Sequence, residues 1–213
     1  MHLQSPQIEE YIQQHTSEEM EVLAQLNRQT NTDVLMPQML SGKVQGQFLQ
    51  MISQMIQPNR ILEIGTYTGY SAICLAQGLA ENGQLVTIDI NEELEDMVRS
   101  FFDKAGLQHK IKYIIGNATQ VIKQLDETWD LVFIDADKQN YSTYYNLAID
   151  KVRSGGFILA DNVLWSGKIT DEKKDKDTQK LAEFNQMVQQ DSRVDNVIVS
   201  IRDGIMMIRK KWF

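Results

Sequence analysis

From Arg60 onward the sequence alternates between short apolar runs and longer amphipathic segments. The apolar runs predict strands near residues 60–64, 84–89, 111–115, 129–135 and 155–160, and the other segments predict helices near 69–80, 91–105, 117–125, 140–152 and 176–190. Repeated strand–helix–strand order requires crossover connections, which make the strands parallel and cover both faces of the sheet with helices. We therefore expect a doubly wound α/β fold.

The last part of the chain breaks this alternation. The runs 194–200 and 204–208 are both strand-like, and only the residues 201–203 separate them. Because no crossover helix fits into so short a gap, the two runs should form an antiparallel pair at the sheet edge. The full prediction is a mostly parallel, seven-stranded sheet with an antiparallel last strand.

The region before Arg60 is predicted to be helical. Ser17 begins a stretch typical of a helix start, Pro37 interrupts the pattern, and a second helix is expected around 46–56. A length of 213 residues favours one domain over two. Residues 1–213 are thus expected to form a single domain that includes 1–57 as an N-terminal helical segment.

Composition narrows the class of protein. A net charge of −8 disfavours a large nucleic-acid surface, because phosphate binding needs basic residues. The chain begins without a secretion signal pattern and has no apolar window long enough to span a membrane, so we expect a cytoplasmic protein without a membrane partner. Cys74, the only cysteine, lies in an apolar run and is expected in the core. The charged stretch 171–177 predicts a solvated loop or helix start.

Two of the apolar runs end abruptly in polar residues. One run ends at Asp135, with Lys138 close behind, and the other ends at Asp161 and Asn162. Each aspartate by itself would more often cap a helix or hold a turn. Together they supply two carboxylates and an amide oxygen, which suit Mg²⁺ first and Mn²⁺ or Ca²⁺ as alternatives, with an amine beside them to act as a base.

The turn after the first strand indicates a nucleoside site. Glu63, Gly65 and Gly69 form the pattern E-x-G-x-x-x-G, and Asp89 ends the next strand, where a carboxylate can accept hydrogen bonds from ribose hydroxyls. The glycines are expected to let a ligand approach the backbone. The pattern lacks the G-x-G-x-x-G spacing of a dinucleotide site and resembles the cofactor loop of class I methyltransferases, which use S-adenosylmethionine.

Further segments resemble the metal-dependent O-methyltransferases of the catechol and caffeoyl-coenzyme A type. The resemblance extends from about residue 35 to the end of the chain and rests on 133–145, 155–167, Asp203-Gly204 and Gln45-Gly46-Gln47. It implies a Rossmann-like methyltransferase fold with a reversed last strand, and homodimers, which are common among relatives. It also implies that Asp135, Asp161 and Asn162 are the metal ligands and that Lys138 is the catalytic base.

The same resemblance implies a set of contacts to S-adenosylmethionine. Residues at matching motif positions are Ser41, Glu63, Gly65, Thr66, Ser71, Asp89, Ala118, Asp135 and Asp137. Candidates for the acceptor site are Lys43, Trp165 and Ser166, although Trp165, like Tyr141, would serve equally well as packing beneath the site.

The function expected from these residues is methyl transfer from S-adenosylmethionine to a hydroxyl of a metal-bound catechol-type phenolic, such as a caffeate-like acid, its coenzyme A ester or a flavonoid. Two alternatives stay open. One is methylation of a hydroxylated uridine in tRNA, and the other is a non-catalytic nucleoside-binding module.

Overall fold

The computed structural model describes residues 5–212 and contains a seven-stranded sheet in the order β3-β2-β1-β4-β5-β7-β6. The strands are β1 (Arg60–Ile64), β2 (Gln84–Asp89), β3 (Ile111–Ile115), β4 (Trp129–Ile134), β5 (Val152–Ala160), β6 (Val194–Val199) and β7 (Ile205–Lys210). Strands β1 to β5 pair in parallel, and β7 pairs antiparallel with both β5 and β6. The predicted sheet is confirmed, and β7 lies between β5 and the edge strand β6.

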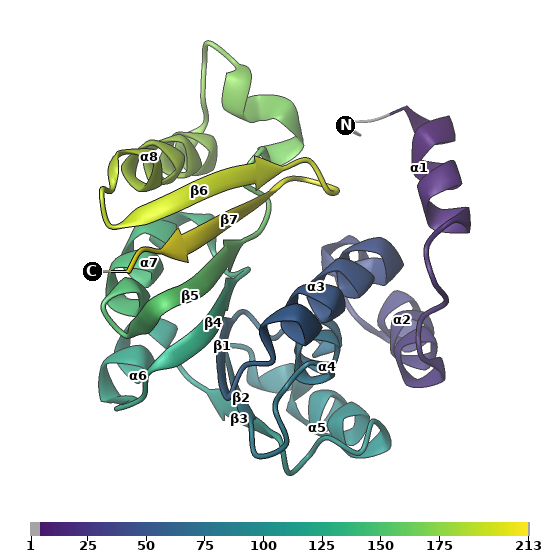
Figure 1. Cartoon of the computed structure of the whole chain (residues 1–213). Coiled ribbons are helices and arrows are strands. Elements are labelled where there is room, and N and C mark those ends of the chain that lie inside the picture. Colours follow the sequence, from purple (N-terminus) through teal and green to yellow (C-terminus); the bar gives the residue numbers. More distant parts are fainter. Residues whose placement is uncertain (1–4, 213) are drawn as a thin grey trace.

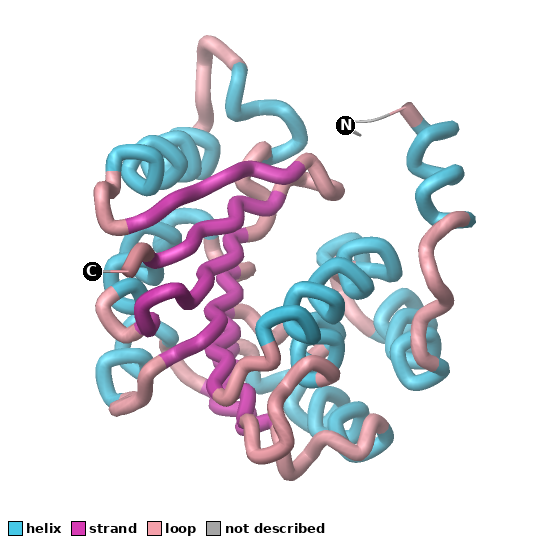
Figure 2. The backbone as a smooth tube through the Cα atoms, in the orientation of Figure 1, coloured by secondary structure: helices cyan, strands magenta, loops and turns pink. Residues whose placement is uncertain are grey.

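Helices cover both faces of the sheet (Figure 2). One layer holds α6 (Ala118–Gln124), α7 (Tyr141–Ile149) and α8 (Lys176–Gln190), and the other holds α2 (Glu21–Asp33), α3 (Gly42–Ile56), α4 (Tyr70–Ala76) and α5 (Glu95–Lys104). Side chains of each strand alternate between the two cores: Leu62 and Ile64 pack in the first, Ile61 in the second. Cys74 is buried in the second core, as predicted.

Short 3₁₀ segments connect several of these elements. They are η1 (Pro37–Met39), η2 (Glu92–Leu94), η3 (Lys138–Asn140) and η4 (Trp165–Thr170). The charged stretch 171–177 forms a loop and the start of α8, where the Asp175 carboxylate accepts a hydrogen bond from the Thr178 N–H at 2.8 Å. Within residues 5–212 no helix is long and apolar enough to cross a membrane.

The N-terminal region differs from prediction in detail. Helix α1 (Pro6–Gln14) buries no residue and lies at the periphery, away from the sheet (Figure 1). Helix α2 begins at Glu21 and not at Ser17, and Glu18 lies in the connector, where it pairs with Lys43 of α3 at 3.0 Å. Helix α3 begins at Gly42, earlier than the predicted residue 46.

Strand β5 begins at Val152, where the prediction still placed a helix. Its first half is irregular: its register against β4 shifts between Trp129 and Leu131, and Gly155 has a left-handed backbone with φ of 74°. The irregularity removes the regular alternation by which a strand is recognised in sequence.

Candidate functional site

Four predicted site residues lie at or just after the carboxyl ends of four neighbouring strands. Gly65 follows β1, Asp89 ends β2, Asp135 follows β4 and Asp161 follows β5. From β1 the chain continues to β2 on one side, whereas β4 and β5 lie on the other side. Ligands of doubly wound folds bind at such a switch in strand order, so this edge is the candidate site.

Gly65 lies where the ends of β1 and β4 meet. Its φ is 100°, and a Cβ atom there would lie 2.0 Å from the carbonyl oxygen of Asp135. At Gly69 a Cβ atom would meet the ring of Phe102 at 2.8 Å. Both positions therefore require glycine because of the protein's own packing, which is a reason in addition to the predicted approach of a ligand to the backbone.

Asp89 holds the loop that follows β1. Its Oδ2 accepts hydrogen bonds from the backbone N–H groups of Thr66 at 2.9 Å and Tyr67 at 2.7 Å, and its Oδ1 accepts one from Asn91 at 2.9 Å. A carboxylate has about four lone-pair sites, so roughly one remains on Oδ1 for a ligand hydroxyl. Asp89 thus shapes the loop and still has room for the predicted ribose contact.

Glu63 is a fully buried carboxyl group beneath this loop. Thr87 donates a hydrogen bond to its Oε2 at 2.6 Å, and the Thr87 hydroxyl in turn lies 2.5 Å from that of Thr66. Burial raises the pKa of Glu63 to about 8, which hydrogen bonds from Ser71 and Thr87 oppose. Glu63 thus joins Asp89, Asp135 and Asp161 in a group of carboxyl residues at this end of the sheet.

Asp135 and Asp161 are two carboxylates that follow the adjacent strands β4 and β5. The Asp161 side chain accepts hydrogen bonds from Gln45 Nε2 at 2.6 Å and from the Asn162 N–H at 2.7 Å. Burial and the negative charge of Asp135 raise the pKa of Asp161 to about 7, and Lys138, Gln45 and Asn162 oppose this rise. A bound cation would relieve the repulsion between the two carboxylates.

The donor set fits a hard divalent ion. Within residues 5–212 no cluster of three or more His, Cys, Asp or Glu side chains is placed to hold a metal. An ion between Asp135 and Asp161 would therefore need the Asn162 amide oxygen as its third protein ligand. Asn162 directly follows Asp161 in a left-handed backbone conformation with φ of 57°. An all-oxygen set of this kind suits Mg²⁺, Mn²⁺ or Ca²⁺ and disfavours softer metals.

Lys138 is the amine of the site, and its side chain is 10% exposed. Its Nζ lies 3.1 Å from Asp135 Oδ1 and donates a hydrogen bond to the Tyr141 hydroxyl at 2.7 Å. Tyr141 is fully buried and donates to the Asp161 carbonyl at 3.0 Å. Burial raises the pKa of Tyr141 well above its usual value, so this phenol stays protonated and holds the amine in place.

Other predicted cofactor contacts occupy the starts of helices or segments near this edge. Ser41 is buried at the residue before α3, and Ala118 is the first residue of α6. Asp137 follows β4, but its Oδ1 accepts a hydrogen bond from Tyr144 and its Oδ2 one from Asn140 at 2.6 Å. Asp137 therefore already has protein partners on both oxygens.

The predicted acceptor residues lie in two segments. Trp165 and Ser166 both have left-handed backbones in η4, and the Lys138 Nζ lies 5.8 Å from the Trp165 ring centre. Lys43 is instead paired with Glu18. Tyr141 is fully buried and packs beneath the site against Phe184, so of the two predicted roles this residue has the packing role.

Several residues of the site were not singled out from sequence. No hydrogen bond between Tyr141 and Lys138 was predicted. The contacts of Gln45, Arg202 and Asp203 join distant parts of the chain. Arg202 Nη1 donates to Gln45 Oε1 at 3.2 Å, and Asp203 Oδ1 accepts from the Ser166 N–H. The resemblance in Gln45-Gly46-Gln47 and Asp203-Gly204 was the only sequence signal for them.

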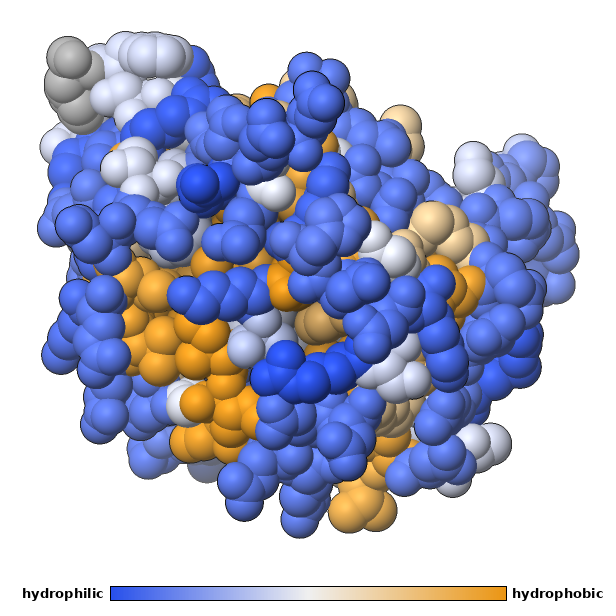
Figure 3. All heavy atoms as spheres, turned by 90° about the horizontal axis from the view of Figure 1, so that it is seen from below, coloured by the Kyte–Doolittle hydropathy of each residue, from blue (hydrophilic) through white to orange (hydrophobic). Residues whose placement is uncertain are grey.

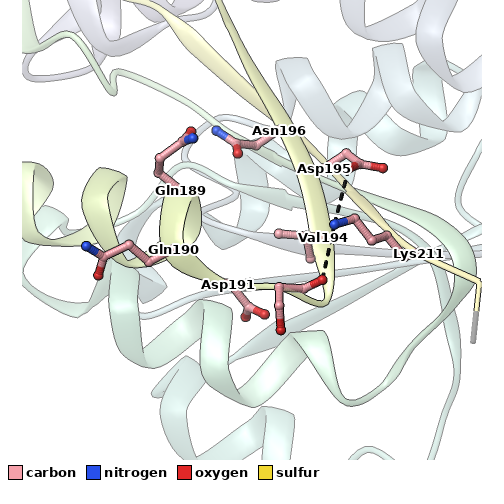
Figure 4. Close-up of a pocket in the computed structure, with 8 residues that line it drawn as sticks. Gln189, Gln190, Asp191, Val194, Asp195, Asn196 and Lys211 are labelled. Carbon is pink, nitrogen blue, oxygen red and sulfur yellow. Dashed lines mark hydrogen bonds and ion pairs between the residues drawn. The ribbon is translucent and has the colours of Figure 1, made fainter.

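A separate groove of about 360 Å³ lies between the end of α8 and the start of β6 (Figure 4). It is lined mainly by polar side chains, among them Gln189, Asp195, Asn196 and Lys211. Since β6 runs parallel to β1 through β5, its first residues lie at the amino ends of these strands, opposite to the end that carries the carboxylates. The groove is therefore not part of the candidate site.

Comparison with known sequences relates this arrangement to characterised proteins. A family model described as O-methyltransferase matches residues 13–211. Caffeoyl-CoA O-methyltransferase 5 of Nicotiana tabacum is 34% identical over 186 residues, which cover 81% of this chain and 77% of the relative. Caffeoyl-CoA O-methyltransferase 2 of Eucalyptus globulus is 36% identical over 186 residues, with 81% and 75% covered.

Solved structures with the same fold contain the cofactor or its product. An O-methyltransferase from Bacillus cereus in complex with SAH superposes with a TM-score of 0.87 at 30% identity, over 96% of this chain and 97% of that one. TomG from Streptomyces achromogenes, involved in tomaymycin synthesis and in complex with SAM, gives a TM-score of 0.87 at 28% identity, over 97% and 96%.

Proposed function

Because this chain belongs to the O-methyltransferase family, whose members use S-adenosylmethionine, we propose that it methylates one hydroxyl of a catechol-type phenolic bound at a divalent metal. One observation carries the proposal. The Lys138 amine lies 3.1 Å from Asp135, which follows β4, and Asp161 follows the adjacent parallel strand β5. A base thus stands beside a pair of oxygen ligands.

In this proposal Asp135, Asp161 and Asn162 would hold the metal ion. An ion of the Mg²⁺ type usually keeps several non-protein oxygens, so it would be able to take both oxygens of a vicinal diol. When bound, the ion supplies positive charge that makes a nearby phenol a stronger acid. A monophenol offers one oxygen fewer and should bind more weakly.

Lys138 then removes a proton from the acceptor hydroxyl. Tyr141 and Asp135 fix the amine in position, and a cation at Asp135 would compete with the ammonium form for that carboxylate. The deprotonated oxygen attacks the methyl carbon, an O–C bond forms, and the S–C bond electrons remain on sulfur in S-adenosylhomocysteine. Holding both reactants in line supplies much of the acceleration.

We assign the cofactor to the carboxyl ends of β1, β2 and β4. Its proposed contacts are Ser41, Glu63, Gly65, Thr66, Ser71, Asp89, Ala118, Asp135 and Asp137. In support, these residues lie at strand ends or in the first turns of α3, α4 and α6 or just before them. Asp89 would accept from the ribose, and the acidic edge would attract the cationic methionine group.

The acceptor is placed beside Trp165 and Ser166, with Lys43 at the start of α3 available to an acidic group. Lys43 would have to leave Glu18, which is a small cost because the Glu18 side chain is 90% exposed. The curated relatives are caffeoyl-CoA enzymes by name. A free catechol, its thioester or a flavonoid all satisfy the diol requirement of the proposed metal site.

The direct test is methyl transfer to a panel of acceptors. We expect turnover with free catechols or caffeoyl-coenzyme A, weak turnover with matching monophenols, and loss of activity with a chelator that added Mg²⁺ restores. Equal activity after metal removal would refute the metal's part. Methylation of purified tRNA with no reaction on catechols would favour the tRNA alternative, and cofactor binding with no metal binding or transfer would favour a non-catalytic module.

A second test addresses the base. Lys138→Ala should lower kcat by roughly 10²-fold or more and leave the Kd for S-adenosylmethionine nearly unchanged. The matched control is Lys123→Ala on α6, which removes an amine outside the site and should leave kcat unchanged. An unchanged kcat in Lys138→Ala would mean that solvent or another group accepts the proton.

We also propose that the protein is a homodimer. In support, α1 exposes Ile8 and Tyr11, which are 52% and 60% accessible. Figure 3 shows a continuous hydrophobic area on the face that contains the β3 end of the sheet. Light scattering coupled to size exclusion measures the mass in solution, and a 24.5 kDa species at micromolar concentration would contradict the proposal.

A further inference from the structure

A chain of hydrogen bonds connects the turn between β6 and β7 to the proposed metal ligand Asp161. Gln45 on α3 is fully buried and lies between the two. Its Nε2 donates to Asp161 Oδ2 at 2.6 Å, and its Oε1 accepts from Arg202 Nη1 at 3.2 Å. These contacts join residues separated by more than a hundred positions in the sequence.

Arg202 determines which way the Gln45 amide faces. A guanidinium group has donors and no acceptor, so the oxygen of the amide must face Arg202 and the nitrogen must face Asp161. If the amide turned over, its oxygen would face a carboxylate oxygen and its nitrogen would face a cation. Both contacts would be repulsive, so Arg202 keeps a donor directed at Asp161.

The Arg202 side chain is exposed, and its guanidinium contacts the start of α3. The two Nη1 hydrogens are shared among Gln45 Oε1 and the carbonyl oxygens of Leu40 at 2.9 Å and Ser41 at 2.5 Å. The Arg202 backbone is left-handed, with φ of 48°, in a turn whose next residue, Asp203, accepts from the Ser166 N–H. The turn thus links the start of α3 to η4 and brings the arginine to Gln45.

We propose that Arg202 and Gln45 act as a positioning pair that fixes the Asp161 carboxylate for the divalent metal. The inference rests on the proposed metal site and deepens it. Neither residue touches metal, cofactor or acceptor. The hydrogen bond from Gln45 uses one lone-pair site of Oδ2 and sets the plane of the carboxylate, so Asp161 presents its remaining lone pairs in one orientation. Partners of this kind change metal affinity by about 10- to 100-fold when they are removed.

The test measures Mn²⁺ binding by electron paramagnetic resonance, without turnover. Gln45→Met keeps the volume of the side chain and removes both polar atoms, and Arg202→Ala removes the donor that orients it. Each should raise the Kd for Mn²⁺ by about 10-fold or more. The double variant should have about the same Kd for Mn²⁺ as the single variant with the higher Kd, because Arg202 acts on Asp161 through Gln45.

The matched control is Arg193→Ala. Arg193 also makes several hydrogen bonds, to Asp191 and Asp150, but at the opposite edge of the sheet. It should lower the melting temperature and leave the Kd for Mn²⁺ unchanged, which separates positioning from general loss of stability. The Kd of Gln45→Met for S-adenosylmethionine should also stay unchanged.

The outcomes separate the positioning role of Arg202 and Gln45 from the existence of the metal site. If the wild-type protein binds Mn²⁺ and both single variants bind it equally well, the positioning role is wrong and the metal site stands. If the losses in Mn²⁺ affinity simply add in the double variant, Arg202 does not act through Gln45. If the wild-type protein binds no Mn²⁺, the proposed metal site fails, and this inference fails with it.

Discussion

The substitution Tyr141→Phe isolates the effect of a single hydroxyl on the position of Lys138. The buried ring packs edge-to-face against Phe184 at 5.4 Å between ring centres, and phenylalanine preserves that contact. The hydroxyl accepts from Lys138 Nζ at 2.7 Å and donates to the Asp161 carbonyl at 3.0 Å. The variant loses these two hydrogen bonds and no packing.

The expected cost follows from the burial of those partners. Leaving a buried carbonyl without its donor costs about 1–3 kcal/mol of unfolding free energy. For a chain of this size each kcal/mol lowers the melting temperature by about 2–4 °C, so the decrease should be roughly 2–12 °C. The Lys138 amine keeps Asp135 and its place near the Trp165 ring but loses the hydrogen bond to the hydroxyl, which should lower kcat by roughly 10-fold to 10²-fold.

The assay follows transfer of a labelled methyl group to the best acceptor of the panel, together with thermal unfolding. Tyr145→Phe is the matched control, because Tyr145 lies on the same helix with a fully buried ring, and its hydroxyl binds Asp191 at 2.8 Å, away from the site. Tyr145→Phe should lower the melting temperature but not kcat. A normal kcat in Tyr141→Phe, or an equal loss in both variants, would refute the reasoning.

Three further substitutions test other parts of the structure. Gly65→Ala places a carbon 2.0 Å from a backbone carbonyl of the β4 end and should unfold the chain at lower temperature by far more than Gly106→Ala, where φ is also positive but the space is open. Asp89→Asn should weaken cofactor binding by roughly 10-fold, as measured by calorimetry. The control is Asp130→Asn, which alters a similar acceptor of two backbone N–H groups at the opposite end of the strands and should leave cofactor binding unchanged. The pKa of Asp191 is lowered to about 2, chiefly by hydrogen bonds from the neighbouring Arg193. The ionised Asp191 carboxylate therefore stabilises the folded state above the unfolded pKa of about 4, and this stabilisation is lost as the pH falls toward 2. Asp191→Asn should therefore unfold at lower temperature than the wild type at pH 6, and the difference should shrink below pH 4; a constant difference would contradict the assignment.

Much of the fold was predictable because local signals and global topology agree. The strands β1 to β4 lie almost where the apolar runs placed them, since buried parallel strands consist of continuous apolar residues. The short gap at 201–203 correctly predicted an antiparallel pair. The irregular start of β5 was missed because a register shift leaves no periodic signal, and the late start of α2 was also missed.

The approach of Asp135 to Asp161 also follows from sequence, because residues that end neighbouring parallel strands must meet at one edge. The same argument placed Asp89 there. It did not reveal that Asp89 holds the Thr66 and Tyr67 backbone, or that Asp137 accepts from Tyr144 and Asn140. These partners depend on side-chain directions that a strand pattern does not specify.

The sequence by itself determined the family, the order of strands and helices along the chain, and the oxygen-rich ends of β4 and β5, because each of these is written in local residue patterns. Only the tertiary structure decided that β7 lies between β5 and β6, that Tyr141 holds Lys138, and that Arg202 reaches Gln45 and through it Asp161. The physical reason is that these contacts join segments that folding brings together, and a hydrogen bond between distant residues leaves no trace in the spacing of either one.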